Sequence, residues 1–224
     1  MAAQLPLDIG GQPSFRREDV VITKANQAAV AFVDAWPNWP APVTMLVGPQ
    51  GSGKTHLARV WQGSSRAVQL NGEELSVSDF ENPNCYLLED IDRARLDETA
   101  LFHLINAVRQ TGKHLLLTSR QPVGALPFAL PDLVSRMRAV AIAALSPPDD
   151  ALLEGVLRKL TADRQIMLDD ATVHYLVVRM ERSLAAAGEL IERLDHIALV
   201  EKRPITRPLA ARVLDALRQP RPDA

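Results

Sequence analysis

Cysteine is almost absent from this sequence, because Cys85 is the single cysteine among 224 residues. One cysteine excludes an internal disulfide and suits a reducing compartment. Aromatic residues make up only 4% of the chain, and the three tryptophans are few and scattered. We therefore expect them to pack in the interior rather than to form platforms for stacked bases. The five histidines show no spacing typical of metal ligands.

Long apolar runs and an excess of positive charge are also missing. No stretch reaches the ~18 apolar residues of a membrane span, and no charged-then-apolar leader opens the chain. The formal net charge of -2 disfavours a protein that holds nucleic acid through its bulk field, although it leaves a local basic patch open. With 47% hydrophobic residues the chain can bury a core. The sequence predicts a soluble cytoplasmic protein.

Short apolar runs alternate with helical patterns over the first two thirds of the chain. Helices are expected from Asn26, from Lys54 and over 97–112. Strands that alternate with helices and are apolar on both faces indicate a parallel sheet. We predict an α/β domain over 21–146, preceded by a tail and linker over 1–20. Its five expected strands are 43–47, 67–70, 85–89, 114–118 and 139–143.

The pattern changes at the segment SPPDD, after which every periodic segment indicates a helix. Ser146 is a candidate N-cap, with the prolines in the first turn of the helix. The aspartate pairs at 149–150 and 169–170 are expected to be helix-start acids. We predict a small all-helical domain over 147–224, with helices at roughly 148–164, 169–181, 185–202 and 206–218.

The segment GPQGSGKT fits the phosphate-loop pattern G-x-x-x-x-G-K-[ST] and lies between a predicted strand and a predicted helix. Its glycines let main-chain N–H groups surround phosphate oxygens, and the helix adds its positive dipole end. Lys54 is expected to reach the β- and γ-phosphates, and the Thr55 hydroxyl to ligate Mg²⁺. This context favours an ATP or ADP site over a chance glycine turn. The residues predicted to bind the nucleotide are Gly48, Pro49, Gln50, Gly51, Ser52, Gly53, Lys54, Thr55 and His56.

Two further strand ends carry candidate catalytic residues. In CYLLEDID, Glu89 and Asp90 are candidates for the Mg²⁺ site, and Asp90 is the candidate that activates water. Because glutamate precedes aspartate here, the reverse of the usual order, we expect slow intrinsic hydrolysis. In HLLLTSR, Ser119 lies where a residue that senses the γ-phosphate is expected, although Thr118 and Ser119 could equally begin a loop.

In combination these motifs resemble those of the DnaA branch of the AAA+ ATPases. VITKANQAAV is similar to the nucleotide-facing linker of that branch, GKTHL to its phosphate loop, LLEDID to its acidic strand end, and LLLTSRQPVGAL to its sensor strand. LVSRM resembles the motif of the arginine finger, and MERSLAAAGELIERL the helix of the second sensor arginine. The resemblance runs from about residue 15 to the C-terminus and implies an AAA+ P-loop domain with a helical lid.

Because no helix-turn-helix domain follows the helical segments, the chain resembles in particular the Hda family, the regulatory inactivators of DnaA, in its alphaproteobacterial form. This resemblance implies a negative regulator of chromosomal replication initiation. Its implied partners are DnaA, the beta sliding clamp of DNA polymerase III and, through the clamp, DNA, with no membrane contact. It implies a cytoplasmic location at the nucleoid or replisome, and it leaves a homodimer open.

The N-terminal segment QLPLDI is similar to the clamp-binding peptide of that family, Q-L-x-L-x-(apolar). An extended peptide can place its apolar side chains in a groove while the glutamine supplies a polar anchor. Pro6 lowers the entropy lost on ordering, and tethering raises the local concentration of the attached domain. The alternative is a strand that folds back on the chain's own sheet edge. The implied clamp-binding residues are Gln4, Leu5, Leu7 and Ile9.

The resemblance assigns the trans arginine finger to Arg136, with Arg138 as a rival and a surface arginine or salt bridge as the alternative. Such fingers contribute ~10³–10⁵ in rate. The second-sensor position falls near Ala186, with Arg182 and Arg193 out of register. We therefore expect Mg-ADP to bind well, and the chain's own ATPase to be weak or dispensable beside its effect on DnaA. An autonomous AAA+ ATPase, such as a helicase loader, is the alternative function.

Overall fold

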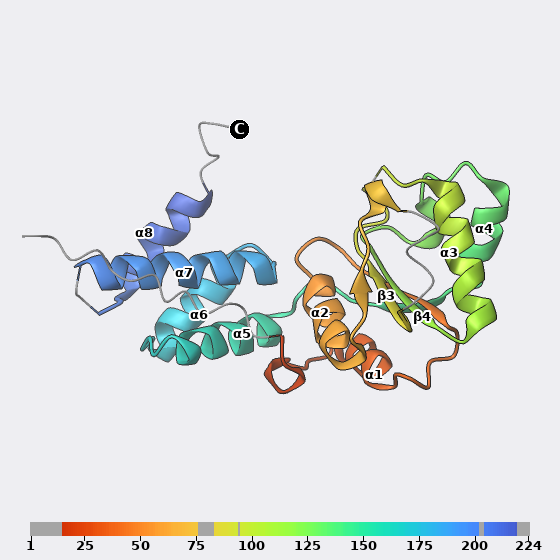
Figure 1. Ribbon diagram of the computed structural model, residues 1–224. Coiled ribbons are helices and arrows are strands. Elements are labelled where there is room, and N and C mark those ends of the chain that lie inside the picture. The colour runs from red at the N-terminus through yellow and green to blue at the C-terminus, as the bar shows by residue number, and fades with distance from the viewer. Residues whose placement is uncertain (1–14, 76–82, 94, 202–203, 219–224) are drawn as a thin grey trace, which may run out of the picture. The chain divides into compact units, whose positions relative to one another are not determined.

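The computed structural model describes residues 15–75, 83–93, 95–201 and 204–218 (Figure 1). Within these ranges the chain forms two compact units, an α/β unit over 15–147 and a helical unit over 148–218. The predicted clamp-binding residues Gln4, Leu5, Leu7 and Ile9 lie outside the described residues. None of the described helices combines the length and the apolar character needed to cross a membrane.

A five-stranded parallel sheet forms the centre of the first unit, which confirms the predicted fold class. The strand order is β2-β3-β4-β1-β5. Because all the strands run in one direction, the residues that follow each of them gather at a single edge of the sheet. The strands are β1 (Val43–Val47), β2 (Val68–Gln69), β3 (Cys85–Leu88), β4 (His114–Ser119) and β5 (Ala141–Ala144).

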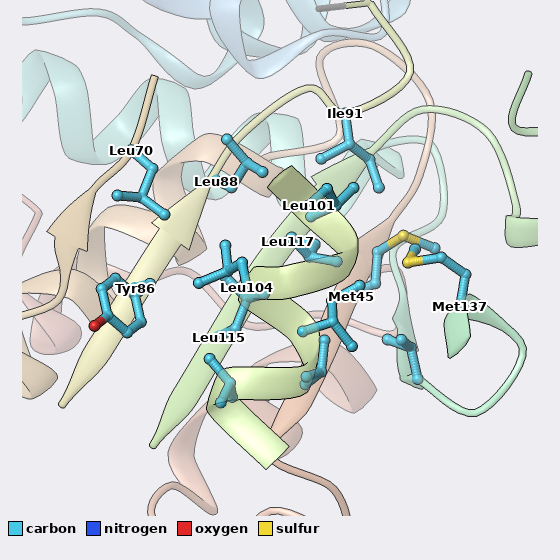
Figure 2. Close-up of a cluster of buried hydrophobic side chains, with 14 of the residues drawn as sticks. Met45, Leu70, Tyr86, Leu88, Ile91, Leu101, Leu104, Leu115, Leu117 and Met137 are labelled. Atoms are coloured by element: carbon cyan, nitrogen blue, oxygen red, sulfur yellow. The ribbon is translucent and has the colours of Figure 1, made fainter. Parts of the chain in front are cut away.

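Each face of the sheet is covered by its own pair of helices. Alternate residues of a strand point to opposite faces, so β1, β3 and β4 supply side chains to both cores. One core lies under α3 (Glu98–Thr111) and α4 (Pro131–Met137), as Figure 2 shows for Leu104 beside Leu115 and Leu117. The other lies under α1 (Gln27–Asp34) and α2 (Lys54–Ser65). Three short 3-10 helices span Arg17–Asp19, Gly72–Glu74 and Val123–Ala125.

The scattered tryptophans meet in the second core, as expected for packing residues. Trp39 stacks on Trp61 with ring centroids 5.1 Å apart, and Trp36 meets Trp61 edge-on at 6.4 Å. Cys85, at the start of β3, is also buried there, and burial raises the pKa of its thiol. These residues serve the interior of the α/β unit.

Replacing Leu104 with alanine is expected to lower the free energy of unfolding by about 2–5 kcal/mol, because it leaves a cavity in a closely packed core. Leu104 has no exposed surface. Chemical denaturation of both variants measures the difference. Ile22→Ala is the matched control, since Ile22 is 49% exposed and lies in the same unit. Equal losses for the two variants would contradict the assignment of Leu104 to the core.

Four helices build the second unit: α5 (Asp150–Asp163), α6 (Asp170–Arg179), α7 (Leu184–Glu201) and α8 (Arg207–Arg218). Their core includes Leu157, Leu176 and Ile191. The expected N-cap at Ser146 is wrong, because α5 begins four residues later, where the Asp149 carboxylate accepts the N–H of Leu152. Asp169 caps α6 in the same way.

Candidate functional site

The loop between β1 and α2 turns at two glycines. Gly51 has a φ of 75° and Gly53 a φ of 97°, a left-handed conformation that side chains with a Cβ rarely adopt. Gly53 is also the N-cap of α2, so its conformation sets the start of the helix at Lys54. The N–H groups at the start of a helix are free to bind an anion, and the helix dipole favours negative charge there.

The start of the loop is held between two neighbouring strands. Gly48 donates its N–H to the Ser119 carbonyl at 3.2 Å, and Leu145 donates to the Val47 carbonyl at 2.7 Å. A Cβ at position 48 would lie 2.6 Å from the Leu145 carbonyl oxygen, so only glycine fits this approach. The ends of β1, β4 and β5 therefore fix the position of the loop.

Lys54 lies inside the loop, with only 6% of its surface exposed. Its Nζ donates to the carbonyls of Gly48 at 2.7 Å and Pro49 at 2.9 Å. Burial lowers the pKa of this ammonium. The hydroxyl of Ser52 is also buried and has no hydrogen-bond partner among the described residues. A buried cation and an unused hydroxyl beside a helix N-terminus suit a phosphate group.

Hydrogen bonds link the residues that follow β3 to the end of β4. The Asp90 N–H donates to the Thr118 hydroxyl at 2.9 Å, and the Ile91 N–H donates to the Thr118 carbonyl at 3.0 Å. Asp90 itself has a φ of 53°, which is uncommon for a residue other than glycine. The charges of Asp90 and Asp92 both raise the pKa of Lys54, against the larger effect of burial. These two carboxylates are thus electrostatically coupled to the phosphate-loop lysine.

Glu89 is engaged elsewhere. Its Oε2 lies 3.3 Å from Nη2 of Arg59 on α2 and accepts a hydrogen bond from Gln69 on β2, also at 3.3 Å. Its Oε1 is buried without a partner among the described residues. Glu89 and Asp90 were both candidates for the Mg²⁺ site, and of these two it is Asp90, together with Asp92, whose charge acts on Lys54. The described residues hold no cluster of three or more His, Cys, Asp or Glu side chains suited to a metal.

The Ser119 hydroxyl is occupied in a turn, since it donates to the Gln121 carbonyl at 2.7 Å and accepts the Gln121 N–H at 3.0 Å. The motifs do not indicate its neighbour Arg120, yet the Arg120 guanidinium donates to Gln50 Oε1 of the loop at 2.8 Å. The Arg120 N–H donates to Asp92 at 3.0 Å. The only signal in the sequence is a basic residue directly after a strand of the sheet.

The ring of Phe15 lies beside that of His56 in the first turn of α2. His56 lies 5.6 Å from Phe15, measured between ring centroids, and Phe15 is 42% exposed. His56 follows Thr55, so this pair lies beside the predicted nucleotide residues. The binding roles of these residues stay predictions.

Arg136 lies in the last turn of α4 and is exposed. Leu133 and Met137 of the same helix are fully buried, which fixes how α4 lies on the unit. Within the described part of the chain, no hydrogen bond or ion pair engages the guanidinium of Arg136 or that of Arg138. Both arginines are therefore available to another molecule.

The arginines near the second-sensor position are engaged within the helical unit. Arg182 pairs with Asp150 at 2.7 Å, and Arg193 pairs with Glu189 at 3.4 Å. Ala186 lies on α7 and is half-buried. No cationic side chain occupies that position itself.

Comparison with known proteins agrees with this architecture. The family model "Hda, lid domain" matches residues 150–214. An uncharacterized protein of Haemophilus influenzae is 29% identical over 189 residues, covering 78% of this chain and 82% of that protein. The chromosomal replication initiator protein DnaA of Enterococcus faecalis is 25% identical over 234 residues, covering 92% of this chain and 52% of that protein. The chain thus spans about half the length of the DnaA relatives it matches.

Solved structures share the fold at low sequence identity. Domain III of the Thermotoga maritima replication initiation protein DnaA has a TM-score of 0.80 at 19% identity, covering 93% of this chain and 99% of that chain. AMPPCP-bound DnaA from Aquifex aeolicus has a TM-score of 0.71 at 16% identity, covering 84% of this chain and 67% of that chain. Together with the matched lid domain, these comparisons show that the chain has the fold of DnaA domain III and that its helical unit is similar to the lid domain of Hda.

Proposed function

We propose that the chain is a negative regulator of replication initiation that stimulates hydrolysis of the ATP bound to DnaA. The observation that carries this proposal is the exposed Arg136, which has no partner within the described residues, in a chain whose helical unit matches the Hda lid domain. A guanidinium on a well-anchored helix can be offered to a phosphate bound by a second protein. There it stabilises the charge that develops in the transition state.

The chain's own site is proposed to hold ATP or ADP. Lys54 and the N–H groups of the loop would bind the phosphates, and Thr55 with Asp90 would hold Mg²⁺, with Glu89 as the further candidate ligand. Magnesium neutralises phosphate charge when it is bound. The relationship to AMPPCP-bound DnaA structures supports a nucleotide here. A nucleotide that binds only the folded α/β unit would raise its free energy of unfolding, and this unit carries Arg136.

Weak turnover by the chain itself accords with the geometry of the acidic strand end. The Glu89 carboxylate pairs with Arg59, and the Ser119 hydroxyl is occupied by Gln121. Asp90 has its main chain fixed to Thr118. We propose that the nucleotide acts mainly as a structural ligand. Rapid ATP hydrolysis by the purified chain alone would instead favour the autonomous ATPase.

The N-terminal segment is proposed to dock on the DNA-loaded sliding clamp, which would bring the regulator and DnaA to the same DNA in the cytoplasm. The sequence pattern at Gln4 and Leu5 supports this step, and the structure does not describe these residues. The assay that tests the proposed function measures hydrolysis of DnaA-bound ATP with the chain, clamp and DNA, and with each omitted in turn. Stimulation should require all three.

The double substitution Gln4→Ala/Leu5→Ala is expected to weaken clamp binding at least about tenfold, because it removes a polar anchor and a buried leucine contact. Surface plasmon resonance with immobilised clamp measures the change. Gln12→Ala is the matched control, since Gln12 lies in the same segment outside the pattern. Undiminished binding by the double variant would remove the clamp from the proposal and leave the effect of Arg136 to be tested separately.

A further inference from the structure

We infer that α3 holds both ends of α4 and thereby positions Arg136 for the phosphate of a second protein. The inference rests on the proposed function, because it concerns how the finger of that proposal is held. It assigns Glu98 and Arg109, at the two ends of α3, as positioning residues that act through Arg136. Neither of them belongs to one of the sequence motifs.

The helix that carries Arg136 is short and packs on the core with one face. It spans only Pro131–Met137, and its N-cap residue is Leu130, whose side chain cannot accept a hydrogen bond. Leu133 and Met137 are fully buried, whereas Arg136 is exposed. Because the hydrophobic effect is non-directional, this burial fixes the direction of the helix axis less closely than hydrogen bonds do.

The first residue of α3 holds the chain just before α4. The Glu98 carboxylate accepts the Leu130 N–H at 2.6 Å, and both of its oxygens lie 3.0 Å from the Ala129 nitrogen. Bonds to a charged acceptor are stronger than bonds to a neutral one. A negative charge at the start of a helix also suits the helix dipole. Glu98 therefore anchors the start of α4, where a leucine side chain cannot.

The last turn of α3 holds the chain just after α4. Nη2 of Arg109 donates to the Ala139 carbonyl at 3.3 Å. Ala139 in turn donates its N–H to the Arg136 carbonyl at 3.1 Å. Arg109 is thus linked to the main chain of Arg136 through a single residue.

Together the two contacts make α3 a support for the whole of α4. The two helices lie side by side (Figure 1), and the start and end of α3 hold the start and end of α4. α3 is itself anchored on the sheet by fully buried side chains, among them Leu101, Leu104 and Ile105. The position of Arg136 is therefore tied to the core of the α/β unit.

This support matters because an arginine finger acts at hydrogen-bond distance from a phosphate oxygen. A displacement of about 1 Å can lower the rate by about a hundredfold, although the reacting groups are all present. Loss of either contact frees one end of α4, so Arg136 would keep its charge and its exposure but lose its fixed position. The expected defect is in the rate of the chemical step rather than in the association of the two proteins.

The test measures single-turnover hydrolysis of DnaA-bound ATP, with clamp and DNA, over a range of concentrations of the chain. Glu98→Ala is expected to lower the maximal stimulated rate by about tenfold to a hundredfold. The concentration that gives half of that rate should change less than about threefold, since Glu98 acts within the chain. Glu98→Gln keeps an amide oxygen as acceptor and should recover part of the rate. Arg109→Ala, which removes one bond to a neutral carbonyl, should lower it by about threefold to tenfold.

Amide hydrogen exchange tests the support in the absence of DnaA. In Glu98→Ala the amides of residues 129–140 should exchange faster than in the wild type, while those of β1 and β4 keep their rates. Thr99→Ala and Gln110→Ala are the matched controls, because these exposed residues neighbour Glu98 and Arg109 on α3. Both controls should match the wild type in exchange and in stimulation. Thermal unfolding sets a temperature at which every variant is folded.

Full stimulation by both Glu98→Ala and Glu98→Gln would overturn the inference and leave the proposed function standing. A change only in the half-maximal concentration would also overturn it, because Glu98 would then belong to the contact surface. Unchanged exchange over 129–140 would show that α3 does not hold α4. A wild-type chain that gives no stimulation would remove the proposed function and this inference with it.

Discussion

Replacing Arg136 with alanine is expected to reduce the stimulation of DnaA-bound ATP hydrolysis by about a thousandfold or to the unstimulated rate, because an arginine finger stabilises charge that no other group can reach. Arg136 is exposed and makes no hydrogen bond or ion pair within the described chain. Its loss should therefore change the stability of the protein by less than about 0.5 kcal/mol. Single-turnover hydrolysis of ATP pre-bound to DnaA, with DNA-loaded clamp present, measures the effect.

Two companion variants sharpen this prediction. Arg136→Lys keeps the positive charge but loses the planar fork, so we expect only partial stimulation. Arg138→Ala tests the neighbouring exposed arginine. If Arg136 is the finger, this variant should keep far more of the stimulation than Arg136→Ala does. Full stimulation by Arg136→Ala, with loss in Arg138→Ala, would transfer the role to Arg138. Full stimulation by both variants would remove the finger from the proposal.

Replacing Lys54 with alanine is expected to weaken ATP and ADP binding by about a hundredfold or more, since it removes a charged hydrogen-bond donor from the centre of the phosphate loop. The ligand-free protein should lose little stability, because burial of the ammonium, which lowers its pKa, opposes folding of the charged form and so offsets the two hydrogen bonds that Nζ donates to the Gly48 and Pro49 carbonyls. Thermal unfolding with and without Mg-ADP tests both points. The rise in Tm that ADP gives the wild type should disappear in the variant.

Lys113→Ala is the control for this measurement, since Lys113 precedes β4 at the opposite edge of the sheet and lies beside Tyr86. It should retain the whole rise in Tm caused by ADP. If Lys54→Ala keeps that rise as well, the loop is not the nucleotide site. A variant that is strongly destabilised without ligand would contradict the account of Lys54 as a buried cation poised for an anion.

Much of the fold follows from local patterns in the sequence. β1 spans 43–47 as predicted, because a short run of apolar residues after a proline-rich loop is typical of a buried strand. The four helices of the second unit lie close to their predicted ranges, since apolar periodicity and acidic caps act within a few residues. The boundaries of the helices and strands were harder to predict. β2 shortens to two exposed residues, and the start of α5 moved from Ser146 to the capping Asp149.

The sequence by itself determined the phosphate loop, the parallel sheet and the helical unit, because glycine conformation, apolar periodicity and helix caps are short-range properties. Only the tertiary structure decided which side chains meet at the strand ends. Glu89 pairs with Arg59, 30 positions away, and Arg120 reaches Gln50, 70 positions away. Such pairs depend on how separate strands converge at one edge and on which acceptor each long side chain finds there. No local pattern encodes that choice, and the packing of the whole sheet settles it.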